Sequence, residues 1–291
     1  AGTYFPLERR FGMPAFREVL LTLSQWFGNN RKDVSNQNSK MLDALDSIRN
    51  RGREEARSPD EHHAQSLIQS AAQQLHSRHD AVNGGYGGAP KFPQAPLLEA
   101  VAMAGALEQG QELHGGLRFT LEQMALSGLR DHLDGGFFRY CVDDHWTIPH
   151  FEKMLYDNAM LLPLYAEGAQ RWNNKLLKSA AEGIADWLDN TMAQAEGGYA
   201  ASIDADAGGE EGAFHVWSKE EIEAALEEPL RSGFISTYGL DGPPNFENQA
   251  WHLKHRAFGR RMDEEGEETD GMSTARDTLY RLREERQHPT L

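Results

Sequence analysis

Residues 135–157, a loop that leads into a predicted helix, hold most of the side chains that could do chemistry. His150, Lys153 and Asp157 follow at the helical spacing i, i+3 and i+7, and Glu152 lies beside them. An imidazole and a carboxylate at the start of a helix can act as general acid and general base if burial brings their pKa values toward neutrality. The alternative is a helix-capping cluster with a surface ion pair on Lys153. We predict that His150 and Glu152 are catalytic.

A second polar stretch, residues 202–217, carries four carboxylates within eight residues. Its Asp-x-Asp-x-Gly start resembles half of a calcium loop, but His215 occupies the position where that loop needs glutamate, so no metal site is predicted. Acidic glycine-rich loops are usually solvated turns. Carboxylates that face His150 across a pocket would instead suit acid/base chemistry on a polyhydroxylated substrate. The predicted opposing catalytic carboxylates are Asp204 and Asp206.

Aromatic and charged residues near these two stretches could bind a sugar ring and its hydroxyl groups. Tyrosine and tryptophan rings can stack on sugar faces, although buried packing is the commoner reason for their presence. Lys91 lies in a loop rich in glycine and proline, which forms either a structural turn or one side of the pocket. No cofactor is predicted. The substrate-binding candidates are Arg139, Tyr140, Asp143, Trp146, Lys153, Asp157, Tyr86, Lys91, Glu210 and Glu211.

Composition limits the class of partner. The chain has 291 residues and a net charge of -16, and no basic patch offsets the repulsion that a phosphate backbone would meet. The sequence contains no apolar run of about 18 residues, so no membrane span is predicted. A single cysteine, Cys141, excludes an internal disulfide and favours a reducing compartment, so we expect the cytoplasm. The predicted partner is therefore a small molecule, and neither nucleic acid nor membrane is expected.

Three glycine pairs, each followed by an aromatic residue, indicate an internal repeat. Gly84-Gly85-Tyr86, Gly135-Gly136-Phe137 and Gly197-Gly198-Tyr199 recur at intervals of roughly 50 to 60 residues, and a predicted helix pair fills each interval. Stacked helical hairpins that present their long loops at a common end require this pattern. Simple glycine caps or a plain helical bundle are the alternatives. We predict an all-α fold, an (α/α) toroid of helical hairpins that is here partial.

Apolar periodicity places the individual helices. Ser218 and Glu221 have the spacing of a capping box, and Pro163 predicts a kink inside its helix. A charged segment containing breakers, residues 51–59, predicts a linker. The predicted domains are residues 1–30, 31–58 and 59–291. The predicted helices are 31–49, 60–78, 96–109, 117–133, 149–172, 174–193, 218–227, 229–238 and 274–287.

At these motifs the chain resembles the YyaL-type, spermatogenesis-associated family. The resemblance implies a thioredoxin-like α/β domain followed by a six-hairpin toroid similar to those of sugar epimerases and glycosidases. Residues 1–30 would then be a C-terminal remnant of the thioredoxin-like domain. The chain would be an internal fragment that self-associates or contacts the missing remainder of the toroid. The motifs that carry the resemblance are Gly2-Thr3-Tyr4-Phe5-Pro6, residues 84–93, residues 135–157, Asp204-Ala205-Asp206, Gly209-Glu210-Glu211-Gly212, Val216-Trp217 and Asn245-Phe246-Glu247.

Two functions stay open from the sequence. The first is a carbohydrate-directed acid/base enzyme, epimerase- or glycosidase-like, with its pocket at the loop end of the hairpins. The second is a non-enzymatic sugar- or peptide-binding or structural module that works with the thioredoxin-like domain. The enzyme hypothesis requires the segment around His150 and Glu152 to meet the acidic turn around Asp204.

Overall fold

The computed structural model describes residues 5–10, 12–50, 61–106, 112–257 and 271–291. The chain divides into two compact units, residues 1–63 and 64–291. The predicted linker and the predicted domain boundary after residue 58 lie outside the described residues.

Between residues 12 and 50, the first unit forms α1 (Phe16–Asn29) and α2 (Arg31–Asn50). An extended segment precedes α1, and its Phe5 ring packs 5.8 Å from the Phe16 ring. Neither helix contains a buried residue, although α1 has apolar side chains at helical spacing. These side chains, which include Leu20, Leu23 and Trp26, are about half exposed. The thioredoxin-like origin of residues 1–30 stays a prediction.

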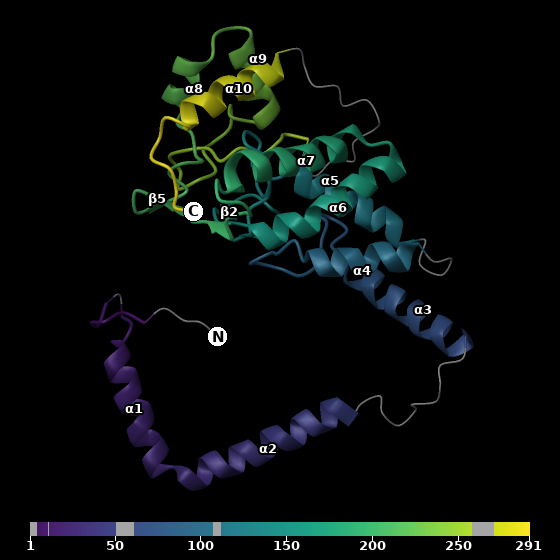
Figure 1. The fold of residues 1–291 in the computed structure, drawn as a ribbon, viewed down its shortest axis with the longest axis vertical. Helices are drawn as coiled ribbons and strands as arrows, with labels where there is room; N and C mark the ends of the chain where they lie inside the picture. Colours follow the sequence, from purple (N-terminus) through teal and green to yellow (C-terminus); the bar gives the residue numbers. More distant parts are fainter. Residues whose placement is uncertain (1–4, 11, 51–60, 107–111, 258–270) are drawn as a thin grey trace. The chain divides into compact units, whose positions relative to one another are not determined.

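The second unit contains packed helical hairpins, which confirms the all-α class predicted from the sequence. The closure of the hairpins into a toroid stays a prediction. Helices α6 and α7 pack along each other, α4 packs against α5 and α6, and α5 packs against α7 (Figure 1). Helices α8 and α9 both contact α10. The helices are α3 (Glu61–Arg78), α4 (Ala95–Gly105), α5 (Leu113–Leu126), α6 (Leu155–Trp172), α7 (Lys175–Trp187) with a π-helical extension (Leu188–Met192), α8 (Lys219–Ala225), α9 (Leu230–Tyr238) and α10 (Met272–Arg283).

Local sequence signals predicted several helix ends well. Asn174 caps α7 by accepting hydrogen bonds from the backbone of Leu176 and Leu177. The capping box of α8 is confirmed, because Ser218 and Glu221 exchange hydrogen bonds of 2.8 and 3.2 Å. The helix predicted over 117–133 instead spans Leu113–Leu126, since Ser127 adopts an extended backbone with ψ 176°.

Three short antiparallel strand pairs lie beside the helices. They pair β1 (Tyr140–Cys141) with β2 (Pro149–His150), β3 (Lys153–Met154) with β4 (Ser202–Ile203), and β5 (Asp206–Ala207) with β6 (Glu210–Glu211). The predicted helix 149–172 is therefore wrong in its first six residues, because β2 and β3 occupy that segment and α6 begins only at Leu155. His150, Lys153 and Asp157 thus do not share a helical stripe, contrary to the prediction.

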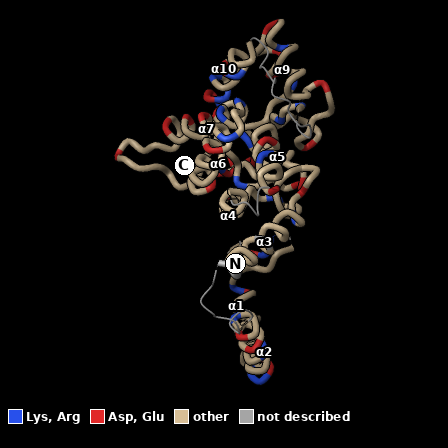
Figure 2. The backbone as a smooth tube through the Cα atoms, turned by 90° about the vertical axis from the view of Figure 1, so that its right-hand side faces the viewer, with Lys and Arg blue, Asp and Glu red and all other residues tan. Residues whose placement is uncertain are grey.

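Acidic and basic residues are interspersed along the second unit (Figure 2), which agrees with the lack of a basic patch in the sequence. Among the described residues, no helix has both the length and the apolarity that crossing a membrane requires.

Candidate functional site

The segment 149–154 divides two sets of polar side chains. Its backbone pairs with β1 on one side and with β4 on the other. Along extended backbone, successive side chains point to opposite faces. Phe151 and Lys153 are accordingly buried, whereas His150 and Glu152 are only half-buried. We call four half-buried residues, Arg139, His150, Glu152 and Asp157, together with the exposed Glu211, the acid–imidazole cluster.

The imidazole of His150 has a defined orientation. Its Nδ1 lies 2.6 Å from Glu211 Oε1, and its Nε2 lies 3.9 Å from Glu152 Oε2. The ring also stacks on Tyr140 at 5.1 Å and 27°. Because an ionised carboxylate only accepts hydrogen bonds, Nδ1 donates to Glu211, and the neutral ring then keeps a lone pair on Nε2. Nε2 is therefore the nitrogen that can accept a proton from another molecule.

Arg139 holds the second carboxylate of the cluster. Its Nη1 donates to Glu152 Oε2 at 2.8 Å, and its backbone N–H donates to the Glu152 carbonyl at 2.8 Å. The hydrogen bond to Glu152 raises the pKa of Arg139. Side chain and backbone thus fix Glu152 next to His150.

Asp157, in the first turn of α6, supplies a third acidic group. Burial raises its pKa to about 6, with Arg139 opposing and the Glu152 charge adding to the shift. Its buried Oδ2 has no hydrogen-bond partner. A carboxyl group that changes protonation near neutral pH can serve as a general acid or base.

The structure brings the two predicted polar stretches together. Among the contacts that join them, His150 bonds Glu211, and Lys153 pairs with Ile203 in the β3–β4 ladder. Within the second stretch, Asp206 pairs with Glu211 across the β5–β6 ladder. Asp204 and Asp206 are exposed, as is Glu210. The backbone N–H of Asp204 donates to the carbonyl of Thr290 at 2.8 Å. The catalytic roles of His150, Glu152, Asp204 and Asp206 stay predictions.

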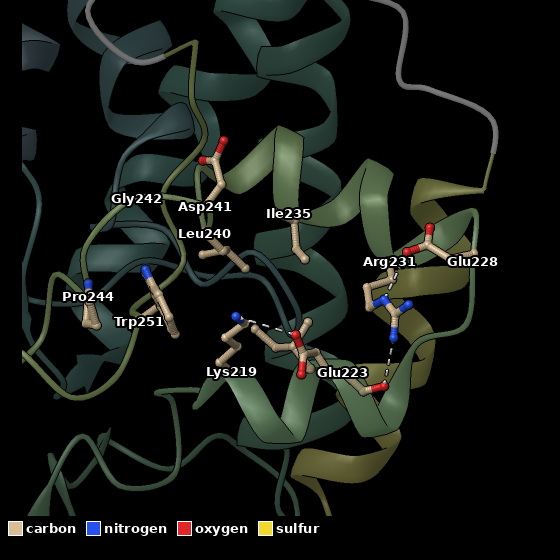
Figure 3. Close-up of a pocket in the computed structure, with 11 residues that line it drawn as sticks. Lys219, Glu223, Glu228, Arg231, Ile235, Leu240, Asp241, Gly242, Pro244 and Trp251 are labelled. Carbon is tan, nitrogen blue, oxygen red and sulfur yellow. Dashed lines mark hydrogen bonds and ion pairs between the residues drawn. The ribbon is translucent and has the colours of Figure 1, made fainter.

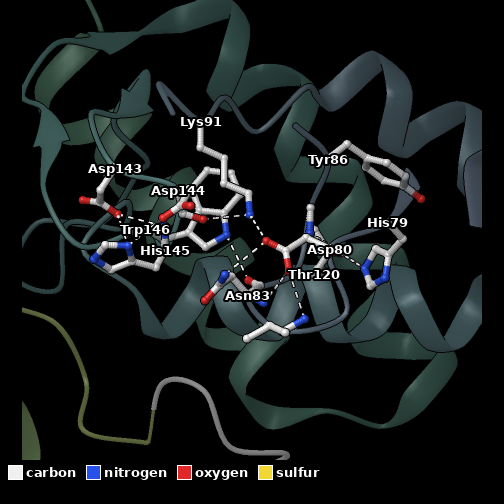
Figure 4. A network of polar contacts seen from close by, with 12 residues as sticks. His79, Asp80, Asn83, Tyr86, Lys91, Thr120, Asp143, Asp144, His145 and Trp146 are labelled. Atoms are coloured by element: carbon white, nitrogen blue, oxygen red, sulfur yellow. Dashed lines mark hydrogen bonds and ion pairs between the residues drawn. The ribbon is translucent and has the colours of Figure 1, made fainter. Parts of the chain in front are cut away.

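Several predicted binding residues lie instead in the scaffold. Lys91 is fully buried, and its Nζ donates to Asp80 Oδ2 at 2.6 Å and to the Asp144 carbonyl at 2.9 Å (Figure 4). Trp146 is also fully buried, with its indole N–H bonded to the Asn83 carbonyl at 3.0 Å. Neither side chain is placed to meet a ligand at the cluster.

Tyr86 and Asp143 have similar structural surroundings. The Tyr86 ring is buried and packs edge-on against His79 at 5.6 Å. The Asp143 carboxylate accepts hydrogen bonds from the backbone N–H groups of His145, Thr147 and Ile148. These contacts close the loop before β2, as Asx-type turns do. Of the predicted binding set, the cluster thus includes Arg139, Asp157 and Glu211, with Tyr140 stacked on it.

Lys153 belongs to a buried ionic group on the other face of segment 149–154. Its Nζ donates to Asp131 Oδ2 at 2.8 Å and to the Gly135 carbonyl at 2.8 Å. Arg283 Nη1 donates to both oxygens of the same carboxylate, at 2.9 and 3.0 Å. Burial would raise the pKa of Asp131, but the charges of Arg283 and Lys153 outweigh it and hold this pKa well below its ordinary value. We call Asp131, Lys153 and Arg283 the buried lock.

The sequence reading missed the aspartates that precede the glycine pairs. Asp80 and Asp131 each stand four residues before the first glycine and bond a buried lysine, Lys91 or Lys153. The spacing Asp-x-x-x-Gly-Gly-aromatic was the available signal. Ala193 occupies this position before the third glycine pair, which therefore lacks the aspartate and its charge.

Two buried histidines were also missed as a pair. The His215 ring stacks on Phe151 at 5.4 Å and 10°, and His252 Nε2 lies 2.6 Å from the Gly128 carbonyl. Burial lowers the pKa of both, that of His252 to about 4, so both rings are neutral near pH 7. Nothing local in the sequence links them, because Phe151 and Phe138 bring them together only in the fold.

A cavity of about 750 Å³ lies apart from the cluster, between α8, α9 and the loop that ends at Trp251 (Figure 3). Ile222, Ile235 and Trp251 give it an apolar wall. Four of its charged residues pair with each other, Arg231 with Glu228 at 3.0 Å and Lys219 with Glu223 at 3.7 Å, and a fifth, Asp241, pairs with Arg256. Within the described parts of the chain, no group of three or more His, Cys, Asp or Glu side chains is arranged to hold a metal ion.

No family model matches the chain. Two solved structures share a low similarity with it. They are a sugar epimerase from a ruminal bacterium (16% identity, TM-score 0.39, 47% of this chain and 40% of that chain) and the cellobiose 2-epimerase of Spirochaeta thermophila (18%, 0.36, 48% and 40%). These TM-scores are too low to support the fold or a function, and the fold rests on the hairpin packing described above.

Curated relatives are more similar in sequence. Human spermatogenesis-associated protein 20 is 32% identical over 251 residues, which is 79% of this chain and 30% of that protein. The rat protein of the same name is 32% identical over 275 residues, 84% of this chain and 33% of that protein. An uncharacterized protein of Caenorhabditis elegans is 34% identical over 170 residues. The chain thus spans about a third of the length of these mammalian relatives, and it belongs to the family of spermatogenesis-associated protein 20.

Proposed function

We propose that the acid–imidazole cluster is the site of a carbohydrate-directed acid/base enzyme, epimerase- or glycosidase-like. The observation that carries the proposal is the His150 imidazole, which Glu211 holds at 2.6 Å through Nδ1 while Nε2 faces Glu152. An imidazole oriented by one carboxylate and placed beside others is the arrangement that proton transfer needs.

In this proposal, each residue has a separate role in proton transfer or binding. His150 Nε2 acts as the base, and Asp157, which is protonated below about pH 6, acts as the acid. In an epimerisation, one group removes a proton from the reacting carbon and the other returns a proton to the opposite face. In a hydrolysis, Asp157 protonates the leaving oxygen while a carboxylate assists water. Arg139 and the exposed Asp204 and Asp206 bind hydroxyl groups.

The test is incubation of the full-length protein with a panel of reducing mono- and disaccharides in D₂O, followed by NMR. Epimerisation replaces hydrogen with deuterium at the reacting carbon, and hydrolysis adds new anomeric signals. Loss of the base in His150→Gln should slow turnover by about 100-fold or more. His145→Gln is the matched control, because His145 also bonds a carboxylate, Asp144 at 2.8 Å, but is exposed and outside the cluster. Equal effects of both substitutions, or a panel with no turnover, would refute the proposal.

The second candidate is a non-enzymatic binding module that works with a thioredoxin-like domain. The cavity beside Trp251 favours it, because an apolar wall with a rim of both charge signs suits a neutral sugar or a peptide. A panel compound that raises the Tm without being turned over would support this candidate. The rise should disappear in Lys219→Ala but persist in Lys178→Ala, because Lys178 forms a similar exposed pair with Glu182 on α7.

A further inference from the structure

The buried lock joins three parts of the chain that lie far apart in sequence. Asp131 stands in the loop before the second glycine pair, Lys153 lies in β3, and Arg283 ends α10. Their exposed fractions are 4%, 1% and 1%. Moving Asp131 would remove the carboxylate that both buried cations bond, which is strongly unfavourable in a protein interior.

Both oxygens of Asp131 are occupied. Oδ1 accepts from Arg283 Nη1 at 2.9 Å and from the backbone N–H of Leu133 at 3.0 Å. Oδ2 accepts from Lys153 Nζ at 2.8 Å and from Arg283 Nη1 at 3.0 Å. Lys153 is thus held at one point inside the protein, and the backbone of β3 is held with it.

The position of Lys153 determines where its neighbour points. Glu152 contacts Arg139 and His150, whereas the next residue, Lys153, contacts Asp131, so the two neighbouring side chains point to different sides of the segment. The residues that follow α10 hold the other side of the cluster. Arg286 Nη1 donates to the Phe214 and Val216 carbonyls at 2.9 and 2.8 Å, and Thr290 accepts from the Asp204 N–H.

We propose that Lys153 and Arg283 are positioning residues, which act through Asp131 to fix segment 149–154 so that Glu152 meets Arg139 and His150. This replaces the direct substrate contact that the sequence suggested for Lys153. It also makes α10 part of the candidate site, although no residue of α10 belongs to the cluster. The inference rests on the proposed function only for the chemical role of Glu152.

The test follows the side-chain carboxyl of Asp157 by ¹³C NMR titration in the full-length protein. Asp157 reports the cluster geometry, because its pKa of about 6 depends on burial, Arg139 and Glu152. In Arg283→Met the segment loosens, and the Asp157 midpoint should fall by about one pH unit toward the value of a solvated carboxyl. Arg283→Lys restores a cation next to Asp131 and should recover most of the original midpoint.

Glu122→Gln is the matched control. Glu122 is also a buried carboxylate, 5% exposed, and it pairs with Arg118 at 2.8 Å on α5, away from segment 149–154. Its substitution should leave the Asp157 midpoint unchanged. If Arg283→Met does not fold, Asp131→Asn carries the same test. A folded Arg283→Met or Asp131→Asn variant with an unchanged Asp157 midpoint would overturn the proposal. A shifted midpoint in a protein that turns over no sugar would leave the lock standing and remove only the proposed function.

Discussion

Asp157 is the residue of the cluster whose charge changes near neutral pH. It lies in the first turn of α6, where the helix dipole favours a negative charge by typically 0.3 to 1 kcal/mol. Its pKa is nevertheless raised, because burial and the neighbouring Glu152 charge outweigh both the dipole and Arg139. The same surroundings that make it a candidate acid should therefore cost the folded protein stability.

The first prediction concerns the stability that the folded protein loses when Asp157 ionises. The folded pKa of about 6 lies above the ordinary 3.8, so the folded state binds more protons than the unfolded state between these values. Stability should fall as pH rises from about 4 to 7. The shift corresponds to about 3 kcal/mol at full burial, and solvent screening of this part-exposed group reduces it to about 1 kcal/mol.

Asp157→Asn cannot ionise and should remove this pH dependence. Urea unfolding of both proteins at pH 4.5 and 7.5 measures it. The variant should gain stability relative to the wild type at the higher pH. A difference between the two proteins that is the same at both pH values would contradict the assignment.

At the scale of elements, the repeated glycine loops set how closely the hairpins approach. Gly135 has φ +81°, and a Cβ there would lie 2.2 Å from the carbonyl oxygen of Gly183 in α7. Gly197, the corresponding residue of the third loop, has φ +94° but open space around it. Both positions require a positive φ, but only Gly135 is packed closely against a helix.

Alanine substitution should separate these two effects. Gly197→Ala meets only the backbone strain of a positive φ and should cost roughly 1 to 2 kcal/mol. Gly135→Ala adds an overlap with α7 and should cost about 3 kcal/mol or more. Chemical denaturation of both variants gives the comparison, and equal losses would show that the loop does not pack on α7 as described.

The sequence predicted those elements whose signals are local. Helix α2, the capping box of α8 and the glycine repeats follow from spacing within a few residues, and all appear in the structure. Segment 149–154 was misassigned because its apolar residues also fit a helical period, whereas β4, the strand partner of β3, lies about 50 residues further along the chain. From the sequence, the contact between His150 and Glu211 could be predicted only as an approach of two loops. The buried lock could not be predicted at all, since it depends on Arg283, which lies 152 residues from Asp131.

At the scale of the whole molecule, the two units differ in how far they bury their apolar side chains. The second unit buries a core of aromatic and aliphatic side chains, whereas the helices of the first bury none. Met41, Leu45 and Ile48 of α2 are more than half exposed, as is Leu23 of α1. Apolar faces of this kind usually mark contact surfaces.

The 291-residue chain on its own should therefore associate. Light scattering should give a mass above 32.6 kDa. Leu23→Glu together with Leu45→Glu should bring the mass down, because buried charges are unfavourable in a contact. Val82→Glu is the control, since Val82 is 74% exposed on the second unit. A monomer at every concentration would contradict the expectation.

The contact between Asp131 and Arg283 spans 152 positions of the chain. A nascent polypeptide leaving the ribosome can form α4 to α7 early, since their contacts are mostly between neighbouring hairpins, but it must wait for residue 283 before Asp131 receives its second cation. Closing so long a loop is entropically slow compared with making a helix pair. The fixed geometry of segment 149–154 should therefore form later than these helix pairs, once residue 283 has been synthesised.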